Sequence, residues 1–497
     1  MKKIILKNSF VSMALQVINI VMNFLTRKLL IQYIGVEWLG INATLASLLS
    51  TFSLAELGIN SVICFYLYAP LRDGDNAEIN HVINIYRILY KCIGAIFLTA
   101  SLLSMFFVPH ILTGVAITYE VYAVYVIMII TSVSSYFLSY RRVLLDADQK
   151  QYMAKKNDIF WGLICGVAQI ILLIRFKSYV VFLSAGILKT VGSNLYLYRK
   201  CGRLYPFLGI QKCSMGELVK TVKKMKEAFF IQIASYVYTG TDNLIISMFV
   251  NTVQVGYLSN YAIISNTVKV IVRSILYPLT PIIGSIVCKD STSSKKVFRL
   301  CTLAAYAIAG MSCIPLLVLS QDFVCSVFGG GYLLGSMIPI LLAGDIVMDV
   351  IQIPSCGLIK GMGLFRHENR ACVAGALTNI IVSLLLVQRY GIAGVLGGTV
   401  VSQIVFFIIR SITVFRHCLA GDTENKIKGY YRDFVKFLSI FILLSAACQK
   451  IYQHMSGLAF ILRFLCGGIL CEILFCFAFI IFWNKGMREI CRLLFNK

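Results

Sequence analysis

Long apolar runs follow one another along almost the whole chain, with short polar segments between them. A helix needs about 20 mostly apolar residues to cross the hydrocarbon core of a bilayer. The pattern therefore predicts an all-α polytopic membrane protein of about 14 transmembrane helices. The predicted spans lie near residues 9–34, 39–68, 82–108, 118–141, 157–176, 178–199, 226–250, 254–287, 298–320, 332–359, 370–388, 391–416, 434–453 and 460–483.

Lysine and arginine residues concentrate in every second connection between these spans. With the N-terminus in the cytoplasm, about 35 of them fall on the inner side and about 5 on the outer side. One missed helix would invert this bias downstream, so the alternation supports the predicted count. The first apolar run continues past Arg27 without a small-residue cleavage site, which indicates an uncleaved first helix. We expect a multi-pass protein of the cell (cytoplasmic or plasma) membrane with both termini cytoplasmic.

Composition agrees with a membrane protein and argues against nucleic-acid binding and against a cysteine-based metal site. The chain has 497 residues, of which 59% are hydrophobic and 14% charged, against about 25% charged in a typical soluble protein. The net charge of +24 follows from the inner-side bias, so we expect no nucleic-acid partner. The 17 cysteines include no CxxC pair and no zinc-type cluster, and we assign them to packing rather than to a metal site.

The longest internal polar segment follows the sixth span and suggests two related halves. We predict an N-terminal six-helix bundle at 1–199, a basic cytoplasmic linker at 200–225, a C-terminal six-helix bundle at 226–417, and two additional helices with a tail at 418–497. The two bundles are expected to be related by pseudo-two-fold symmetry, a common transporter plan.

A shift of 216 residues aligns the first helices of the two halves. Helix 1 carries a polar stripe whose members lie within about 80° of one another on a helical wheel. The equivalent helix carries a similar stripe, so both helices are expected to turn a polar face toward one central cavity. The shift pairs Gln16 with Gln232, Asn19 with Ser235, Asn23 with Thr239, Arg27 with Asn243, and Gly40 with Gly256.

Cations inside predicted spans are the strongest candidates for substrate binding, because a charge costs about 2.5–3.5 kcal/mol there on insertion scales. Arg27 lies in helix 1, and Lys269 and Arg273 share one face of helix 8. Two or three converging cations suit a phosphate or pyrophosphate. Their structural alternatives are ion pairs within the membrane, with Glu56 or Asp242, or side chains that snorkel to an interface. We expect the polar residues Asn23, Gln16 and Gln232 to line the same cavity.

Four acidic residues are candidates for ion coupling: Glu56, Asp242, Asp345 and Asp349. Glu56 and Asp242 either bind a coupling ion or hold the cations in place, and Asp345 and Asp349 alternatively line a wet vestibule. The five histidines are scattered at loops or span ends, and no nucleophile, P-loop or metal motif is present. We therefore expect no enzyme activity, no cofactor and no metal.

The sequence also resembles a known family. Residues 24–68 (FLTRKLLIQYIGVEWLGINATLASLLSTFSLAELGINSVICFYLY) and 241–268 (TDNLIISMFVNTVQVGYLSNYAIISNTV) are similar to Wzx-type polysaccharide flippases of O-antigen, capsule or teichuronic type. These flippases belong to the multidrug/oligosaccharidyl-lipid/polysaccharide exporter superfamily. The shared features are Arg27, the turn from Gly35 to Gly40, and the LAELGI segment at 54–59.

The resemblance implies two bundles that alternate between inward-facing and outward-facing states. The implied cargo is a polyprenyl-pyrophosphate oligosaccharide, flipped to the outer leaflet for surface polysaccharide biosynthesis, with Arg27 in the stretch where relatives place a cavity cation. Implied partners are membrane lipids and the polysaccharide polymerase machinery. A flippase for the peptidoglycan precursor, a multidrug or cation antiporter of the same superfamily, and a membrane enzyme are the alternatives; basic cavity helices disfavour the antiporter, and short outer loops disfavour the enzyme.

Overall fold

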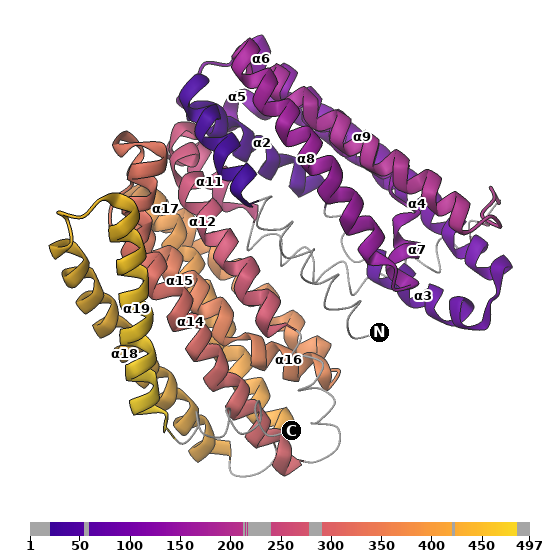
Figure 1. The fold of residues 1–497 in the computed structure, drawn as a ribbon. Coiled ribbons are helices and arrows are strands. Elements are labelled where there is room, and N and C mark those ends of the chain that lie inside the picture. Colours follow the sequence, from indigo (N-terminus) through magenta and orange to yellow (C-terminus); the bar gives the residue numbers. More distant parts are fainter. Residues whose placement is uncertain are drawn as a thin grey trace. The chain divides into compact units, whose positions relative to one another are not determined.

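The computed structural model describes residues 20–53, 59–211, 214, 216, 240–277, 291–419 and 423–484. These residues are almost entirely helical, include no strand, and fall into two compact units, Met1–Gly256 and Tyr257–Lys497 (Figure 1). Within the described ranges, nine helical segments are long and apolar enough to cross a membrane. The predicted all-α, multi-pass architecture is therefore confirmed, while the predicted domain boundaries after 199, 225 and 417 stay predictions.

The first unit consists of long helices joined by short turns. Residues 20–33 are helical and precede α2. Asp75 caps α4, since its carboxylate accepts hydrogen bonds from the backbone N–H groups of Ala77 (3.1 Å) and Glu78 (3.0 Å). The remaining elements are α2 (Glu37–Phe52), α3 (Ile59–Asp73), α4 (Asn76–Ser104), η2 (Met105–Phe107), α5 (Val108–Ile111), α6 (Tyr119–Leu138), α7 (Arg142–Ala147), α8 (Gln151–Phe176), α9 (Tyr179–Leu204) and α11 (Asp242–Phe249).

The predicted spans 157–176 and 178–199 are two separate helices, α8 and α9. Between them Lys177 adopts a left-handed backbone conformation (φ 47°, ψ 34°), which ends α8 and lets the chain reverse within two residues. The pair is held by polar contacts inside the bundle: Asn157 Nδ2 donates to Ser193 Oγ (2.7 Å) and to the Ser193 carbonyl (3.1 Å). Gly192 packs on the Trp161 ring so closely that a Cβ atom would lie 2.4 Å from it.

Helix α12 (Thr252–Leu276) begins in the first unit and continues into the second. The other elements of the second unit are α14 (Ser291–Phe328), η3 (Gly330–Tyr332), α15 (Met337–Ile351), α16 (Ile353–Gly361), α17 (Phe365–Thr413), η4 (Val414–Cys418), α18 (Thr423–His454) and α19 (Phe460–Phe482). The predicted span 332–359 is interrupted at Gln352, two residues before Pro354 in the first turn of α16. A proline lacks the N–H that would continue the helical hydrogen bonds.

Helix α17, continued by η4, contains the predicted spans 370–388 and 391–416 as two legs. Gly391 has φ 55° and ψ −130°, a conformation open to glycine, and it reverses the chain there. The legs then pack at close range, since a Cβ on Gly394 would lie 2.4 Å from the Leu386 carbonyl oxygen. Asn379 Nδ2 donates to Thr399 Oγ1 (3.0 Å), and Ser383 Oγ donates to the Val395 carbonyl (3.2 Å) across the same contact.

The C-terminal helices α18 and α19 pack together on α14 (Figure 1). The Tyr306 ring on α14 stacks on Phe437 of α18 with centroids 4.7 Å apart. On the α19 side, Gly310 leaves room for the Phe475 ring, which would lie 2.0 Å from a Cβ at that position. These contacts fix the register of the two last helices on the core of the second unit.

Gly40 and Gly256, which the predicted 216-residue shift pairs, lie at a reciprocal backbone contact between α2 and the first turns of α12. A Cβ on Gly40 would lie 2.0 Å from the carbonyl oxygen of Thr252, and one on Gly256 would lie 2.4 Å from the carbonyl oxygen of Val36. Val36 and Thr252 are themselves 216 residues apart. Equivalent positions thus contact one another in both directions, as expected where two related segments meet across a pseudo-two-fold axis.

Candidate substrate and coupling site

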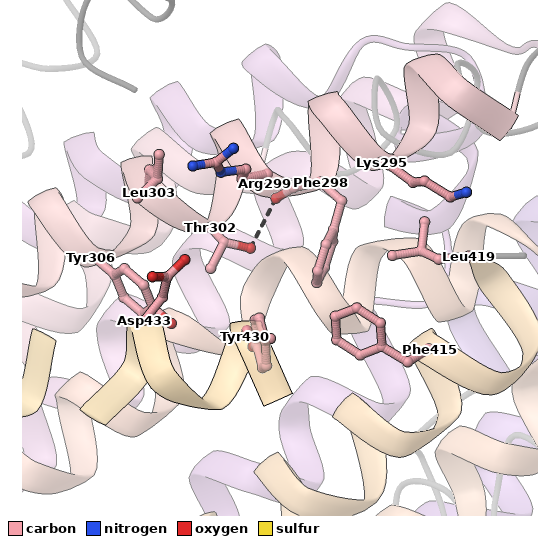
Figure 2. A pocket seen from close by; sticks show the side chains of 11 residues that line it. Lys295, Phe298, Arg299, Thr302, Leu303, Tyr306, Phe415, Leu419, Tyr430 and Asp433 are labelled. Carbon is pink, nitrogen blue, oxygen red and sulfur yellow. Dashed lines mark hydrogen bonds between the residues drawn. The ribbon is translucent and has the colours of Figure 1, made fainter. Parts of the chain in front are cut away.

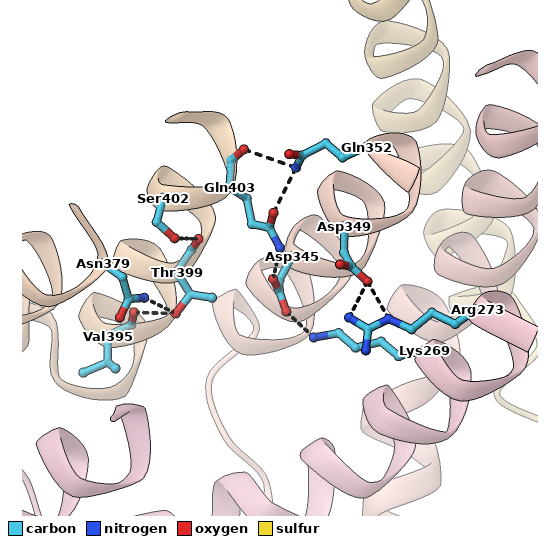
Figure 3. A network of polar contacts seen from close by, with 10 residues as sticks. All are labelled: Lys269, Arg273, Asp345, Asp349, Gln352, Asn379, Val395, Thr399, Ser402 and Gln403. Atoms are coloured by element: carbon cyan, nitrogen blue, oxygen red, sulfur yellow. Dashed lines mark hydrogen bonds and ion pairs between the residues drawn. The ribbon is translucent and has the colours of Figure 1, made fainter. Parts of the chain in front are cut away.

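Two ion pairs, one helical turn apart, join α12 to α15. Lys269 Nζ lies 2.6 Å from Asp345 Oδ2. Arg273 donates from Nη2 (2.8 Å) and Nε (3.1 Å) to Asp349 Oδ2 (Figure 3). Residues four apart share one face of a helix. Because the later residue of α12 pairs with the later residue of α15, the two helices run in the same direction here. Helices 8 and 10 of the predicted topology require that direction.

The two ion pairs differ in their exposure. The Lys269 and Asp345 side chains are 21% and 11% exposed, whereas those of Arg273 and Asp349 are 40% and 22% exposed. An incoming ligand therefore reaches the Arg273–Asp349 pair more easily.

We call these two ion pairs, Lys269–Asp345 and Arg273–Asp349, the ladder. A chain of hydrogen bonds connects the ladder to α17. Gln403 Nε2 donates to Asp345 Oδ1 (3.1 Å), and Gln352 Nε2 donates to Gln403 Oε1 (2.9 Å) (Figure 3). Arg410 Nη1 donates to Gln352 Oε1 (3.0 Å), and Arg410 Nε donates to Glu368 Oε2 (3.1 Å). An unbroken series of polar contacts therefore leads from Lys269 to Glu368.

The ion-paired side chains of the network comprise equal numbers of cations and carboxylates, and Lys360 lies close enough to Glu368 to interact with it electrostatically. The three paired cations are Lys269, Arg273 and Arg410, and the three paired carboxylates are Asp345, Asp349 and Glu368. Pairing and hydrogen bonding offset the desolvation of each buried charge, whereas loss of one partner leaves the other uncompensated. The Glu368 pair is the most deeply buried, with side chains 15% and 4% exposed.

The sequence predicts four of these six charged residues as site residues, but the predicted partners of the cations differ from the observed ones. Glu56 and Asp242 are the counterions expected from the sequence, whereas Lys269 and Arg273 pair with Asp345 and Asp349. Glu368 was not singled out, because it follows a loop and belongs to the charged segment RHENR. Gln403, an amide inside the apolar run 391–416, is the signal that could have indicated a polar network on α17.

In the first unit the predicted cavity residues have other surroundings. Arg27 is half-buried and close enough to Tyr179 to interact electrostatically with it, while Asn23 is exposed. Asp242 is half-buried at the first turn of α11, and the neighbouring Asn243 donates to Ser47 Oγ (3.1 Å). The convergence of Arg27 with Lys269 and Arg273 stays a prediction. Gln16, Gln232 and Glu56 lie outside the described residues.

No group of three or more His, Cys, Asp or Glu side chains with metal-binding geometry occurs within the described ranges. The charged side chains of the network are instead paired with one another.

Solved structures of membrane transporters share this fold. Lipid II flippase MurJ in an inward closed conformation is 14% identical with a TM-score of 0.65, and the match covers 96% of this chain and 99% of that one. An inward-facing multidrug resistance MATE family transporter of the MOP superfamily is 12% identical with a TM-score of 0.61, covering 80% and 94%. A mutant of the Vibrio cholerae MATE transporter VcmN is 12% identical with a TM-score of 0.56, covering 83% and 98%. Neither a protein-family model nor a curated protein sequence matches the chain.

At these identities the likeness concerns the fold. The chain has the helical, multi-pass architecture of these membrane transporters, and each neighbour is a transporter or flippase rather than an enzyme.

Proposed function

We propose that the chain is a flippase that moves a polyprenyl-pyrophosphate oligosaccharide from the cytoplasmic to the outer leaflet by alternating access. The observation that carries this proposal is the ladder of Lys269–Asp345 and Arg273–Asp349, two basic side chains one turn apart on a single helix face. Two adjacent cations match the two phosphates of a pyrophosphate, and arginine in particular can bind phosphate oxygens in a bidentate manner.

The ion pairs make substrate binding an exchange. Pyrophosphate oxygens replace Asp345 and Asp349 at the cations, so the buried positive charge is never left without a partner. The two released carboxylates then bind a proton or a metal cation, which is the coupling role proposed for them. Release of the headgroup restores the pairs, and this return stabilises the empty carrier.

The membrane potential favours the proposed direction. A cell interior that is negative drives an anionic headgroup outward by about 2.3 kcal/mol per charge per 100 mV. The lipid tail stays in the bilayer while the headgroup passes through the polar interior, so a small number of spaced cations suffices.

A second candidate, translocation of the peptidoglycan precursor lipid II, is favoured by one specific observation. The match to lipid II flippase MurJ spans 96% of this chain, whereas the MATE transporters cover 80% and 83% of it. The same comparison gives less support to a multidrug or cation antiporter.

Complementation of a deletion strain tests the proposal. Arg273→Ala and Arg27→Ala should abolish surface polysaccharide and leave lipid-linked oligosaccharide on the cytoplasmic face, while Arg273→Lys and Arg27→Lys should retain partial function. Arg389→Ala, which removes an exposed arginine elsewhere, is the matched control and should behave as wild type. Normal polymer output from both alanine variants, with equal protein in the membrane, would contradict the proposed anion site. Accumulation of lipid II instead of oligosaccharide lipid in the deletion strain would establish the second candidate.

A further inference from the structure

A pocket between α8 and α9 of the first unit has a volume of about 290 Å³. Its lining is apolar except for one charged side chain, Lys189. The small residues Ala185 and Gly192 contribute no long side chain to it, and the side chains of Ile164 and Leu188 at its border are exposed. The pocket therefore opens to the surroundings of these two helices, where it can receive an apolar side chain.

Lys189 lies near the middle of its span. It comes 10 residues after Tyr179, the first residue of α9, and 15 residues before Leu204, the last, which correspond to about 15 Å and about 22 Å along the helix. Lys189 is exposed and lies close enough to the Cys165 thiol to interact with it electrostatically. It forms no ion pair with a carboxylate of the described residues. A charged residue inside a span almost always has a polar or charged partner, so Lys189 indicates an anion supplied from elsewhere.

The pocket in Figure 2 is arranged differently. It has a similar volume and lies between α14, η4 and α18. Its own lining carries both signs of charge, because Asp433 accompanies Lys295 and Arg299. The α8–α9 pocket carries a cation alone, so its charge calls for an anion from outside the pocket.

A carboxylate with the complementary requirement lies on α19. Glu472 comes 12 residues after Phe460, about 18 Å, and 10 residues before Phe482, about 15 Å, so it also lies near the middle of its span. Its Oε2 atom is buried without a hydrogen-bond partner, and no cation of the described residues forms an ion pair with it. The neighbouring side chains of Ile469 and Ile473 are exposed. Glu472 therefore lies beside an apolar surface that α19 turns outward.

The two residues match in charge and in depth. They lie about 15 Å and about 18 Å from the first residues of α9 and α19. These helices are the sixth and fourteenth predicted spans, which run in the same direction, so two copies inserted alike place Lys189 of one and Glu472 of the other at nearly the same depth. Phospholipid phosphates lie at the interface, about 15 Å from the middle of a roughly 30 Å hydrocarbon core. A second copy of the chain therefore supplies the anion at a depth where lipid headgroups do not.

We propose that two copies of this chain associate in the membrane, with Glu472 of one copy paired to Lys189 of the other and the apolar flank of α19 seated in the α8–α9 pocket. Small residues such as Ala185 and Gly192 are typical of close helix contacts in membranes. The pairing offsets the desolvation of both charges. The ladder takes no part in this contact, so the association is independent of which substrate is carried.

The test measures the oligomeric state of the full-length protein in lipid bilayers by single-molecule photobleaching at several protein-to-lipid ratios. The wild type should bleach in two steps. Lys189→Glu and Glu472→Lys each bring like charges together, and each alone should weaken association by at least about tenfold. The double variant Lys189→Glu/Glu472→Lys should regain association, because it restores the pair with the signs exchanged.

Mixed membranes distinguish a contact between copies from a contact within one chain. Copies with Lys189→Glu and copies with Glu472→Lys, labelled with different fluorophores, should associate with each other although neither associates with itself. Each contact in the mixed dimer joins opposite charges, and the association also shows that both variants are folded. Recovery in the double variant without association in the mixture would place the pair within one chain and overturn the proposal.

The matched control is Arg199→Glu, which reverses an exposed charge nearer the other end of α9. It should associate like the wild type, because Arg199 lies outside the pocket lining. A wild type that bleaches in one step at every protein-to-lipid ratio, or single variants at Lys189 and Glu472 that associate as tightly as the wild type, would overturn the proposal.

Discussion

Arg410 and Glu368 form the most deeply buried ion pair that the described residues contain, and Arg410 also donates to Gln352. Two cysteines also contact the carboxylate, with Cys356 Sγ at 3.5 Å and Cys372 Sγ at 4.0 Å from Glu368 Oε1. The pair joins the start of α17 to its second leg, and through Gln352 it reaches the break between α15 and α16. We infer that this end of the network fixes the helices, whereas the Lys269–Arg273 end exchanges partners.

The buried pair should therefore be essential for stability. Glu368→Ala leaves the Arg410 guanidinium without its counterion and should lower stability by about 3–5 kcal/mol, measured as thermal unfolding in detergent. Glu368→Leu/Arg410→Met, which removes both charges, should recover much of that loss. Asp73→Ala breaks the exposed Arg72–Asp73 pair and should leave unfolding unchanged. Equal destabilisation by the single and the double variant would contradict a charge-pair explanation.

Lys269 and Asp345 should separate stability from transport. Asp345→Asn leaves Lys269 without its carboxylate and should reduce both thermal stability and flipping. Lys269→Met/Asp345→Leu should restore stability but not flipping, because the substrate then lacks a cation. Recovery of transport in this double variant would mean that the pair is structural only. Flipping is measured in proteoliposomes with a fluorescent lipid-linked oligosaccharide.

The Gly40–Gly256 contact predicts a steric requirement. Gly40→Ala places a Cβ 2.0 Å from the Thr252 carbonyl oxygen, and since both groups belong to helix backbones the helices must separate. Gly256→Ala meets the Val36 carbonyl oxygen in the same way. Each variant should lower the unfolding temperature by several degrees. Gly186→Ala, on α9 with no atom within 4 Å of the added Cβ, should leave it unchanged or raise it slightly. Unaltered unfolding in both crossing variants would show that this contact carries no stability.

Much of this fold follows from hydropathy and charge, for physical reasons. A run of more than 40 apolar residues cannot be one span, so the reversals at Lys177 and Gly391 were predictable from length. The shared face of Lys269 and Arg273 follows from helical periodicity alone. Which helix faces them does not, because hydropathy says nothing about neighbours in space. Asp345 and Asp349 were therefore candidates without known partners.

The break at Gln352 and the role of Glu368 show a different limit. Apolar residues continue through 337–361, so the hydropathy pattern predicts one span although Pro354 interrupts its hydrogen bonds. Glu368 resembles an interfacial charge because charged residues surround it in sequence. However, helix α17 begins at Phe365, and Glu368 in its first turn accepts a hydrogen bond from Arg410. Burial of single polar residues depends on tertiary packing that one sequence does not encode locally.

Coupling can be tested through the carboxylates of the ladder. If binding of the headgroup releases Asp349 from Arg273, the free carboxylate takes up a cation, and transport should depend on pH or sodium in the wild type. Asp349→Asn cannot take up that charge, so its residual transport should lose this dependence while still responding to membrane potential. The potential response should remain because the headgroup itself is anionic, at about 2.3 kcal/mol per charge per 100 mV. Transport by Asp349→Asn is compared with wild type in proteoliposomes at imposed potentials, with and without a proton or sodium gradient. If Asp349→Asn keeps the full ion dependence, coupling does not reside at Asp349, and this part of the proposal is wrong.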